Sequence, residues 1–141
     1  MLNDERIRFG DGVLYDCFFL KQVEIPSFIT EIGENAFFGC KSLKSIQIPS
    51  SVTKIGDFAF KGCESLTQIF IPSSVISIGS NVFENCHLLK EISIPFSLSV
   101  GNLGIDEKAL KKKELNLKLY KWIVFGFDQC INLECIEIPN D

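Results

Sequence analysis

Cysteine is the most regularly spaced residue of this chain, so its chemistry is considered first. Five of the six cysteines share one phase of a repeat, namely Cys17, Cys40, Cys63, Cys86 and Cys130. The first four are spaced by 23 residues. Zinc binding requires close pairs of the C-x₂₋₄-C type. The one close pair is Cys130 and Cys135. Cys135 lies at the start of a predicted strand, so we expect its side chain to point away from Cys130.

Disulfides between successive units are sterically possible, because Cα atoms about 5 Å apart can be bridged. However, side chains stacked in parallel point the same way, and the predicted compartment is reducing. We therefore interpret the five in-phase thiols as small buried apolar filler. Cys135 is out of phase, faces outward on its strand, and is the candidate reactive thiol.

Catalytic constellations are not indicated. The single histidine, His87, occupies a slot held elsewhere by Lys41 and Glu64, so we expect an exposed corner residue. No serine lies in a G-x-S-x-G motif, and the carboxylates are scattered. Gly10-Asp11-Gly12 lacks the lysine and helix of a phosphate-binding loop. We expect no enzyme, no cofactor and no metal.

The composition is that of an ordinary globular domain. The 141 residues are 46% hydrophobic and 23% charged, with a formal charge of −4, which does not favour a nucleic-acid partner. No run of 18 apolar residues predicts a membrane span. The first residues lack a basic region followed by an apolar one, so no signal peptide is predicted and the cytoplasm is the default location.

The elements that position these residues form a repeat. Units of 23 residues occupy 25–47, 48–70 and 71–93, each opening on Ile-Pro. Ile46 and Ile48 alternate with polar residues, which is typical of a half-buried strand. Pro49 ends that strand, and Phe60 is predicted to enter the core from a tight apolar turn. Stacked units would align equivalent residues about 4.8 Å apart.

The motif IPSSVTKIGDFAFKGCESLTQIFIP resembles the BspA-like, or treponemal-type, leucine-rich repeat. The match is nearly complete over residues 25–95, partial over 9–24 and 125–139, and weak over 96–124. The resemblance implies an α/β, horseshoe-like solenoid with a parallel sheet on its concave face and short strands and helical turns elsewhere. It also implies binding of macromolecules, often in adhesion, and a cell-surface location.

We divide this single domain into a degenerate N-terminal unit (1–24), regular repeats (25–95), an irregular insert (96–124) and a last partial repeat (125–141). Within the insert, 106–113 is predicted as a short surface helix, and the alternation around Leu117 predicts a strand. Its lysines beside Tyr120 and Trp122 fit either an acidic partner or, as we favour, a drifted repeat with a solvated face and Trp122 in the core.

The outward positions of the strands form the candidate partner-binding surface. Its residues are Gln22, Glu24, Ser45, Gln47, Gln68, Phe70, Glu91, Ser93 and Glu137. Phe70 stands in a column that is otherwise Glu, Gln or Ser, so it is either an aromatic anchor or an ordinary exposed apolar residue.

Two functions follow. The first is a non-catalytic interaction module that binds a protein partner through the concave strand face. The alternative is an assembly element: Ile136 and Ile138 are predicted to lie on an unpaired last strand, a sheet edge open to self-association into a homo-oligomer.

Overall fold

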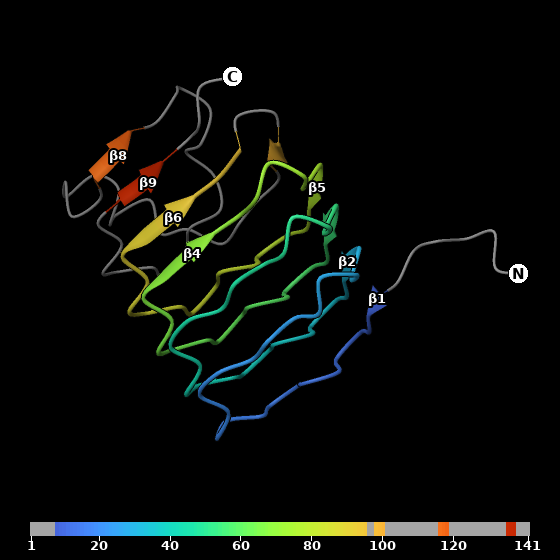
Figure 1. The fold of residues 1–141 in the computed structure, drawn as a ribbon. Helices are drawn as coiled ribbons and strands as arrows, with labels where there is room; N and C mark the ends of the chain where they lie inside the picture. Colours follow the sequence, from blue (N-terminus) through green and yellow to red (C-terminus); the bar gives the residue numbers. More distant parts are fainter. Residues whose placement is uncertain (1–7, 96–97, 101–115, 119–134, 138–141) are drawn as a thin grey trace, which may run out of the picture.

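The computed structural model describes residues 8–95, 98–100, 116–118 and 135–137. Figure 1 shows the chain as a coil whose short strands gather on two sides. Their bounds are β1 Arg8–Phe9, β2 Glu31–Ile32, β3 Lys54–Ile55, β4 Gln68–Phe70, β5 Ser77–Ile78, β6 Glu91–Ser93, β7 Ser99–Val100, β8 Asn116–Lys118 and β9 Cys135–Glu137. We call each turn of this coil a rung: the first spans 8–30, the second 31–53, the third 54–76, and the fourth begins at 77.

The strands form two parallel sheets. One has the order β1-β2-β3-β5-β7 and the other β4-β6-β9-β8. In the first sheet Glu31 pairs with Lys54, and Lys54 pairs with Ser77. In the second sheet Gln68 pairs with Glu91. Each of these pairs joins residues 23 positions apart, so equivalent side chains of successive rungs stack in columns.

The corners between the sheets contain no helix in the described part of the chain, in contrast to the predicted helical turns. They are single turns closed by bonds such as Cys63 N–H to Phe60 O, at 3.2 Å. Gly62, the third residue of this four-residue turn, has φ at +75°. A left-handed residue cannot continue a right-handed helix, so the turn ends there. The predicted helix at 106–113 lies outside the described residues.

The predicted open edge at the last strand is wrong. β9 pairs with β6 on one side, where Ile92 meets Ile136, and with β8 on the other, where Leu117 meets Ile136. The strand predicted around Leu117 does form, but it lies outside β9. β9 carries the alternating pattern of the regular repeats and therefore takes the place beside β6, which makes β8 the outer strand.

The core between the two sheets is built from columns of identical or similar residues. Phe37, Phe60 and Phe83 are fully buried, as the sequence predicted for Phe60. Their rings stack with centroids 5.1 Å apart between Phe37 and Phe60, and 6.1 Å apart between Phe60 and Phe83. None of the residues described as buried is polar or charged. The stability of the coil therefore comes mainly from apolar contact between rungs.

Candidate binding surface

The candidate surface follows the second sheet and the rungs that precede it. Its two columns hold side chains that point away from the core, because buried isoleucines alternate with them along each strand. Gln68, Glu91 and Cys135 stand in register in one column, and Phe70, Ser93 and Glu137 in the other. Glu24 and Gln47 extend the second column through an isolated parallel bridge.

Sequence reasoning placed these side chains on the correct side of the strand. Seven of the nine are exposed and Ser93 is half-buried; the exposed ones are Gln22, Glu24, Ser45, Gln47, Gln68, Phe70 and Glu91. Glu137 is described only by its backbone, which pairs with Ser93. The structure therefore brings the eight predicted residues whose side chains it describes onto one face.

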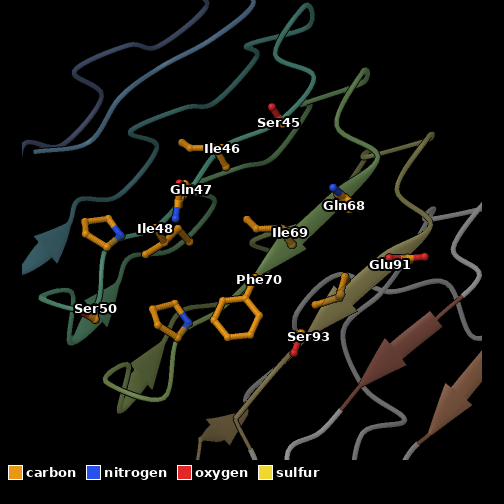
Figure 2. Close-up of a pocket in the computed structure, with 13 residues that line it drawn as sticks. Ser45, Ile46, Gln47, Ile48, Ser50, Gln68, Ile69, Phe70, Glu91 and Ser93 are labelled. Atoms are coloured by element: carbon orange, nitrogen blue, oxygen red, sulfur yellow. The ribbon is translucent and has the colours of Figure 1, made fainter. Parts of the chain in front are cut away.

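An open groove of about 740 Å³ lies in the middle of this face. Figure 2 shows the residues that line it, with Phe70 central among the labelled side chains. Six of the predicted residues line the groove: Ser45, Gln47, Gln68, Phe70, Glu91 and Ser93. Gln22 and Glu24 belong to the first rung and are not among the lining residues. The groove thus spans three successive rungs rather than one.

Phe70 is the apolar centre of the groove. Its side chain is 60% exposed, although its neighbour Ile69 is buried in the core. Pro49 and Pro72 also line the groove. Because proline fixes the backbone φ angle, the groove is lined in part by rigid backbone. An exposed aromatic ring on a rigid support is a suitable anchor for an apolar group of a partner.

Seven lining residues were not in the predicted set: the buried Ile46, Ile48, Ile69 and Ile92, and also Pro49, Ser50 and Pro72. Of the prolines and the serine, only Pro49 had a predicted role, as the residue that ends its strand. The signal that could have identified the prolines is position: Pro49 and Pro72 follow the buried Ile48 and Ile71, where each extended segment ends at the border of the candidate surface.

The electrostatic character of the groove is nearly neutral. Among its lining residues, Glu91 is the charged one, and the other polar groups are hydroxyls and amides. Lys21, Lys44 and Lys90 lie exposed just before the strands and do not line the groove. The arrangement can accept and donate hydrogen bonds around an apolar centre, with one carboxylate at its margin.

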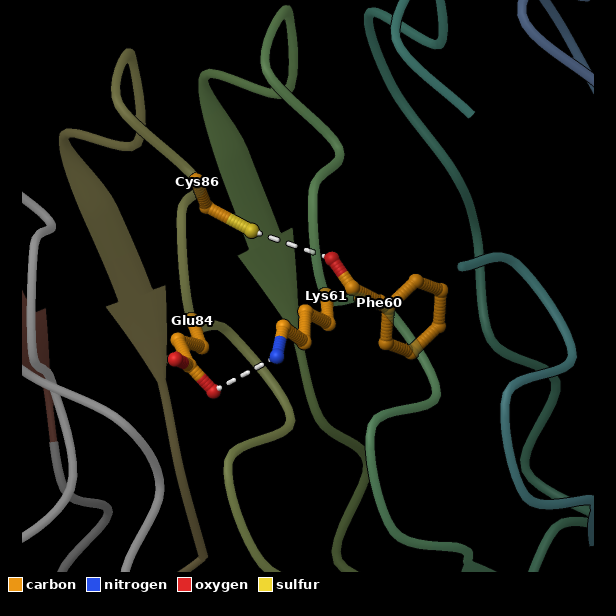
Figure 3. A network of polar contacts seen from close by, with 4 residues as sticks. All are labelled: Phe60, Lys61, Glu84 and Cys86. Carbon is orange, nitrogen blue, oxygen red and sulfur yellow. Dashed lines mark hydrogen bonds and ion pairs between the residues drawn. The ribbon is translucent and has the colours of Figure 1, made fainter. Parts of the chain in front are cut away.

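The cysteine column lies at the corner of the rungs. Cys40, Cys63 and Cys86 are buried free thiols and Cys17 is half-buried. Each buried thiol donates to a carbonyl of the preceding rung: Cys63 Sγ to Phe37 O at 3.2 Å, and Cys86 Sγ to Phe60 O at 3.1 Å. Figure 3 shows the second bond. Cys40, Cys63 and Cys86 are thus buried as predicted and also link rungs by weak hydrogen bonds, Cys17 is more exposed than predicted, and Cys130 lies outside the described residues.

Burial raises the pKa of these thiols. Desolvation, followed by the nearby Cys17, raises the pKa of Cys40 to about 11. Desolvation raises the pKa of Cys86 to about 12, against the opposing effect of a backbone hydrogen bond. The pKa of Cys63 is also raised well above its ordinary value by desolvation. A protonated thiol is a weak nucleophile and a poor metal ligand, so Cys40, Cys63 and Cys86 are disfavoured for both roles at neutral pH.

Two other sequence candidates have different outcomes. His87 is half-buried at its corner rather than exposed. Cys135 is described only by its backbone, which pairs with Glu91 and Asn116, so its reactivity stays a prediction.

Within the described residues no group of three or more potential metal ligands gathers. The same part of the chain contains no helix that is long and apolar enough to cross a membrane.

A family model described as a BspA type leucine rich repeat region matches residues 7–121. The chain belongs to the BspA-type leucine-rich repeat family. The comparison of this BspA-type chain with curated proteins gives no match.

Solved structures agree with this membership. A leucine-rich cell surface protein of Faecalibacterium prausnitzii is 25% identical with a TM-score of 0.71, over 100% of this chain and 31% of that one. The T. pallidum leucine-rich repeat protein is 27% identical with a TM-score of 0.71, over 93% of this chain and 62% of that one.

The pneumococcal vaccine antigen PcpA, at 23% identity and a TM-score of 0.66 over 99% of this chain and 31% of that one, shows the fold alone. The BspA-type chain thus spans between 31% and 62% of the length of these three proteins.

Proposed function

We propose that this chain is a non-catalytic protein-interaction module that binds a macromolecular partner through the strand face centred on Phe70. The observation that carries the proposal is the groove of about 740 Å³ around an aromatic ring that is 60% exposed. Interface cores are enriched in aromatic residues, and a few such residues carry most of the binding free energy. Membership of a repeat family whose proteins generally act as binding modules supports it.

The proposal includes the shape of the surface. We propose that the sheet of β4, β6, β9 and β8 is the concave side of a horseshoe-like solenoid, and that residues 1–141 act as one domain. The parallel columns on this sheet support this part of the proposal, because small rotations between rungs curve a solenoid and make extended binding surfaces.

We also propose that the partner is met at a cell surface, in an adhesion-related role. The support is the likeness to a protein named as a cell surface protein. Protease treatment of intact cells that produce the chain tests the location: a surface protein is digested, whereas a cytoplasmic one is protected. Protection of the whole pool would contradict this part of the proposal.

Mutation of the groove tests the site. A photo-reactive amino acid at position 68 cross-links the partner, which is then identified by mass spectrometry and purified for binding measurements. Phe70→Ala should weaken binding by about 30-fold or more, as expected for truncation of an anchor residue. Ile76→Ser is the matched control, because Ile76 is 71% exposed on the same rung but does not line the groove. Equal affinities for wild type and Phe70→Ala would reject the site.

A further inference from the structure

Four outward-facing residues in the middle of the strand face form a square. Gln68 and Phe70 come from β4, and Glu91 and Ser93 stand beside them in register on β6. Residues two apart along a strand are separated by about 6.6 Å and parallel strands by about 4.8 Å, so the Cα atoms of Phe70 and Glu91 lie about 8 Å apart across the diagonal. Figure 2 shows Ser93 beside the ring of Phe70, and Glu91 further along the strand that carries Ser93.

Each member of the square offers a contact to a positively charged group. The face of the Phe70 ring carries partial negative charge and attracts a cation within about 6 Å of its centroid. The carboxylate of Glu91 accepts hydrogen bonds from charged N–H groups, and the hydroxyl of Ser93 and the amide oxygen of Gln68 also accept. Glu91 is the charged residue among those that line the groove. The square therefore favours a cation over an anion or a neutral group.

The corner of the coil contains an occupied example of the same combination. Lys61 Nζ lies 5.3 Å from the ring centroid of Phe58 and 3.2 Å from a carboxylate oxygen of Glu84. There the ring belongs to the third rung and the carboxylate to the fourth, as they do for Phe70 and Glu91. None of the described side chains places a cation over Phe70 or forms an ion pair with Glu91. The strand face thus presents the ring and the carboxylate to a cation from outside.

Arginine fits this square better than lysine does. Its guanidinium is planar, so it can stack on the Phe70 ring while its N–H groups donate in pairs to the Glu91 carboxylate. Its five N–H donors leave others for the hydroxyl of Ser93 and the amide oxygen of Gln68. Its methylene stem covers apolar surface such as that of Pro72. The ammonium of lysine is more strongly hydrated and has no plane to stack.

We infer that the square of Gln68, Phe70, Glu91 and Ser93 is a subsite for an arginine side chain of the partner. The inference rests on the proposed function, because it names the side chain that the partner places on Phe70. Arginine is among the residues that carry most of the binding free energy at interfaces. The formal charge of −4 also favours the approach of a basic segment.

NMR titration with short blocked peptides tests the subsite. The probes are acetyl-Gly-Arg-Gly-amide and its analogues with citrulline, lysine, norleucine or glutamate in place of arginine. The arginine probe should bind with a Kd of about 1–10 mM, as expected for one side chain, and should shift the amide signals of residues 68–70 and 91–93. Citrulline keeps the shape without the charge and should bind at least about fivefold more weakly. Lysine should bind at least about twofold more weakly than arginine.

Two variants assign the preference to the square. Glu91→Gln should remove the difference between the arginine and citrulline probes, because the ionised acceptor is gone. Glu24→Gln is the matched control, since Glu24 is exposed on the same face but does not line the groove; it should bind every probe like wild type. The spectra themselves report whether each variant is folded. Norleucine or glutamate binding as tightly as arginine, or a preference for arginine that survives Glu91→Gln, would overturn the inference.

The cross-linked partner separates this inference from the proposed function. Both are supported if Phe70→Ala and Glu91→Gln each weaken the binding of that partner, the second by about fivefold or more. If Phe70→Ala weakens it and Glu91→Gln does not, the strand face is the site and the arginine inference is wrong. If the arginine probe binds at the square but neither variant alters partner binding, the arginine site stands and the proposed function is wrong.

Discussion

The rings of Phe60 and Phe37 lie parallel, with their centroids 5.1 Å apart and an interplanar angle of 2°. Both rings are fully buried, and they come from residues 23 positions apart. The column continues to Phe83 and, at its other end, to Phe9, whose ring stacks on Phe37 at 5.2 Å. One stack of aromatic rings therefore crosses every rung interface of the regular part of the fold.

Removing the central ring of this column should be costly. Phe60→Ala should lower the free energy of unfolding by about 3–5 kcal/mol, because the rungs on both sides hold the cavity open. Urea denaturation followed by circular dichroism measures the change. Phe70→Ala is the matched control: it removes the same side chain from a 60% exposed position of the same rung and should change stability by about 0.5 kcal/mol or less. Equal effects would mean that the column does not carry the core.

Gly10 and Gly56, at the same position of two rungs, give a second prediction with an internal control. Gly56→Ala places a methyl group 2.6 Å from the backbone nitrogen of Glu34, where backbone and not a flexible side chain must move. We expect a loss of about 1–3 kcal/mol, the usual cost of overpacking. Gly10→Ala makes the same change where no described atom lies within 4 Å, and should be neutral or stabilising by a few tenths of a kcal/mol, about the range expected for an unstrained position. The difference between the two melting curves tests the close stacking of rungs.

Lys61 connects three side chains on the outer surface of the corners. Its Nζ lies 3.2 Å from a carboxylate oxygen of Glu84, as Figure 3 shows, and 5.6 and 5.3 Å from the ring centroids of Phe38 and Phe58. A double-mutant cycle with Lys61→Met and Glu84→Gln should give a coupling of about 0.5–1 kcal/mol that decreases in high salt. The single variant Lys61→Met should lose more than Glu84→Gln, because it also removes the cation from the two rings. The reverse order would show that the rings contribute nothing.

The periodic part of the fold was predictable because each column has one physical requirement. A buried column accepts only apolar residues of similar volume, so Phe60 and the isoleucines revealed the core. Alternation then placed Phe70 and Gln68 on the outward side. Neither inference needed long-range information, since every rung repeats the environment of the one before.

The remaining features depend on how rungs meet, which alternation does not encode. β9 pairs with β6 and displaces β8 to the edge because its pattern continues that of the regular rungs, although residues 94–134 separate them in the chain. The groove depends on Pro49 and Pro72, whose sequence signal is shared with ordinary strand ends. A tight turn at Phe60 was predictable, but alternation carries no signal for the left-handed residues of the corners, such as Asn35 and Asn81.

The buried thiols predict how stability depends on pH. An unfolded cysteine ionises near its ordinary pKa of 9.0, whereas burial raises the pKa of Cys40 to about 11 and that of Cys86 to about 12. Above pH 9 the unfolded chain therefore releases thiol protons that the folded chain keeps. The stabilisation is complete below the unfolded pKa and is lost as pH rises toward the folded values. Each such thiol should make the free energy of unfolding fall by about a further 1.4 kcal/mol per pH unit in this range.

Cys86→Ser isolates the contribution of one thiol, since serine does not titrate in this range and keeps a donor toward Phe60 O. Lysines and tyrosines of the unfolded chain also titrate above pH 9, but they affect both proteins equally. We therefore compare the slopes of unfolding free energy against pH between 9 and 11 for wild type and variant. The variant's slope should be shallower by about 1.4 kcal/mol per pH unit. Parallel slopes would mean that Cys86 ionises in the folded chain as readily as in the unfolded one, and that the corner is open to water.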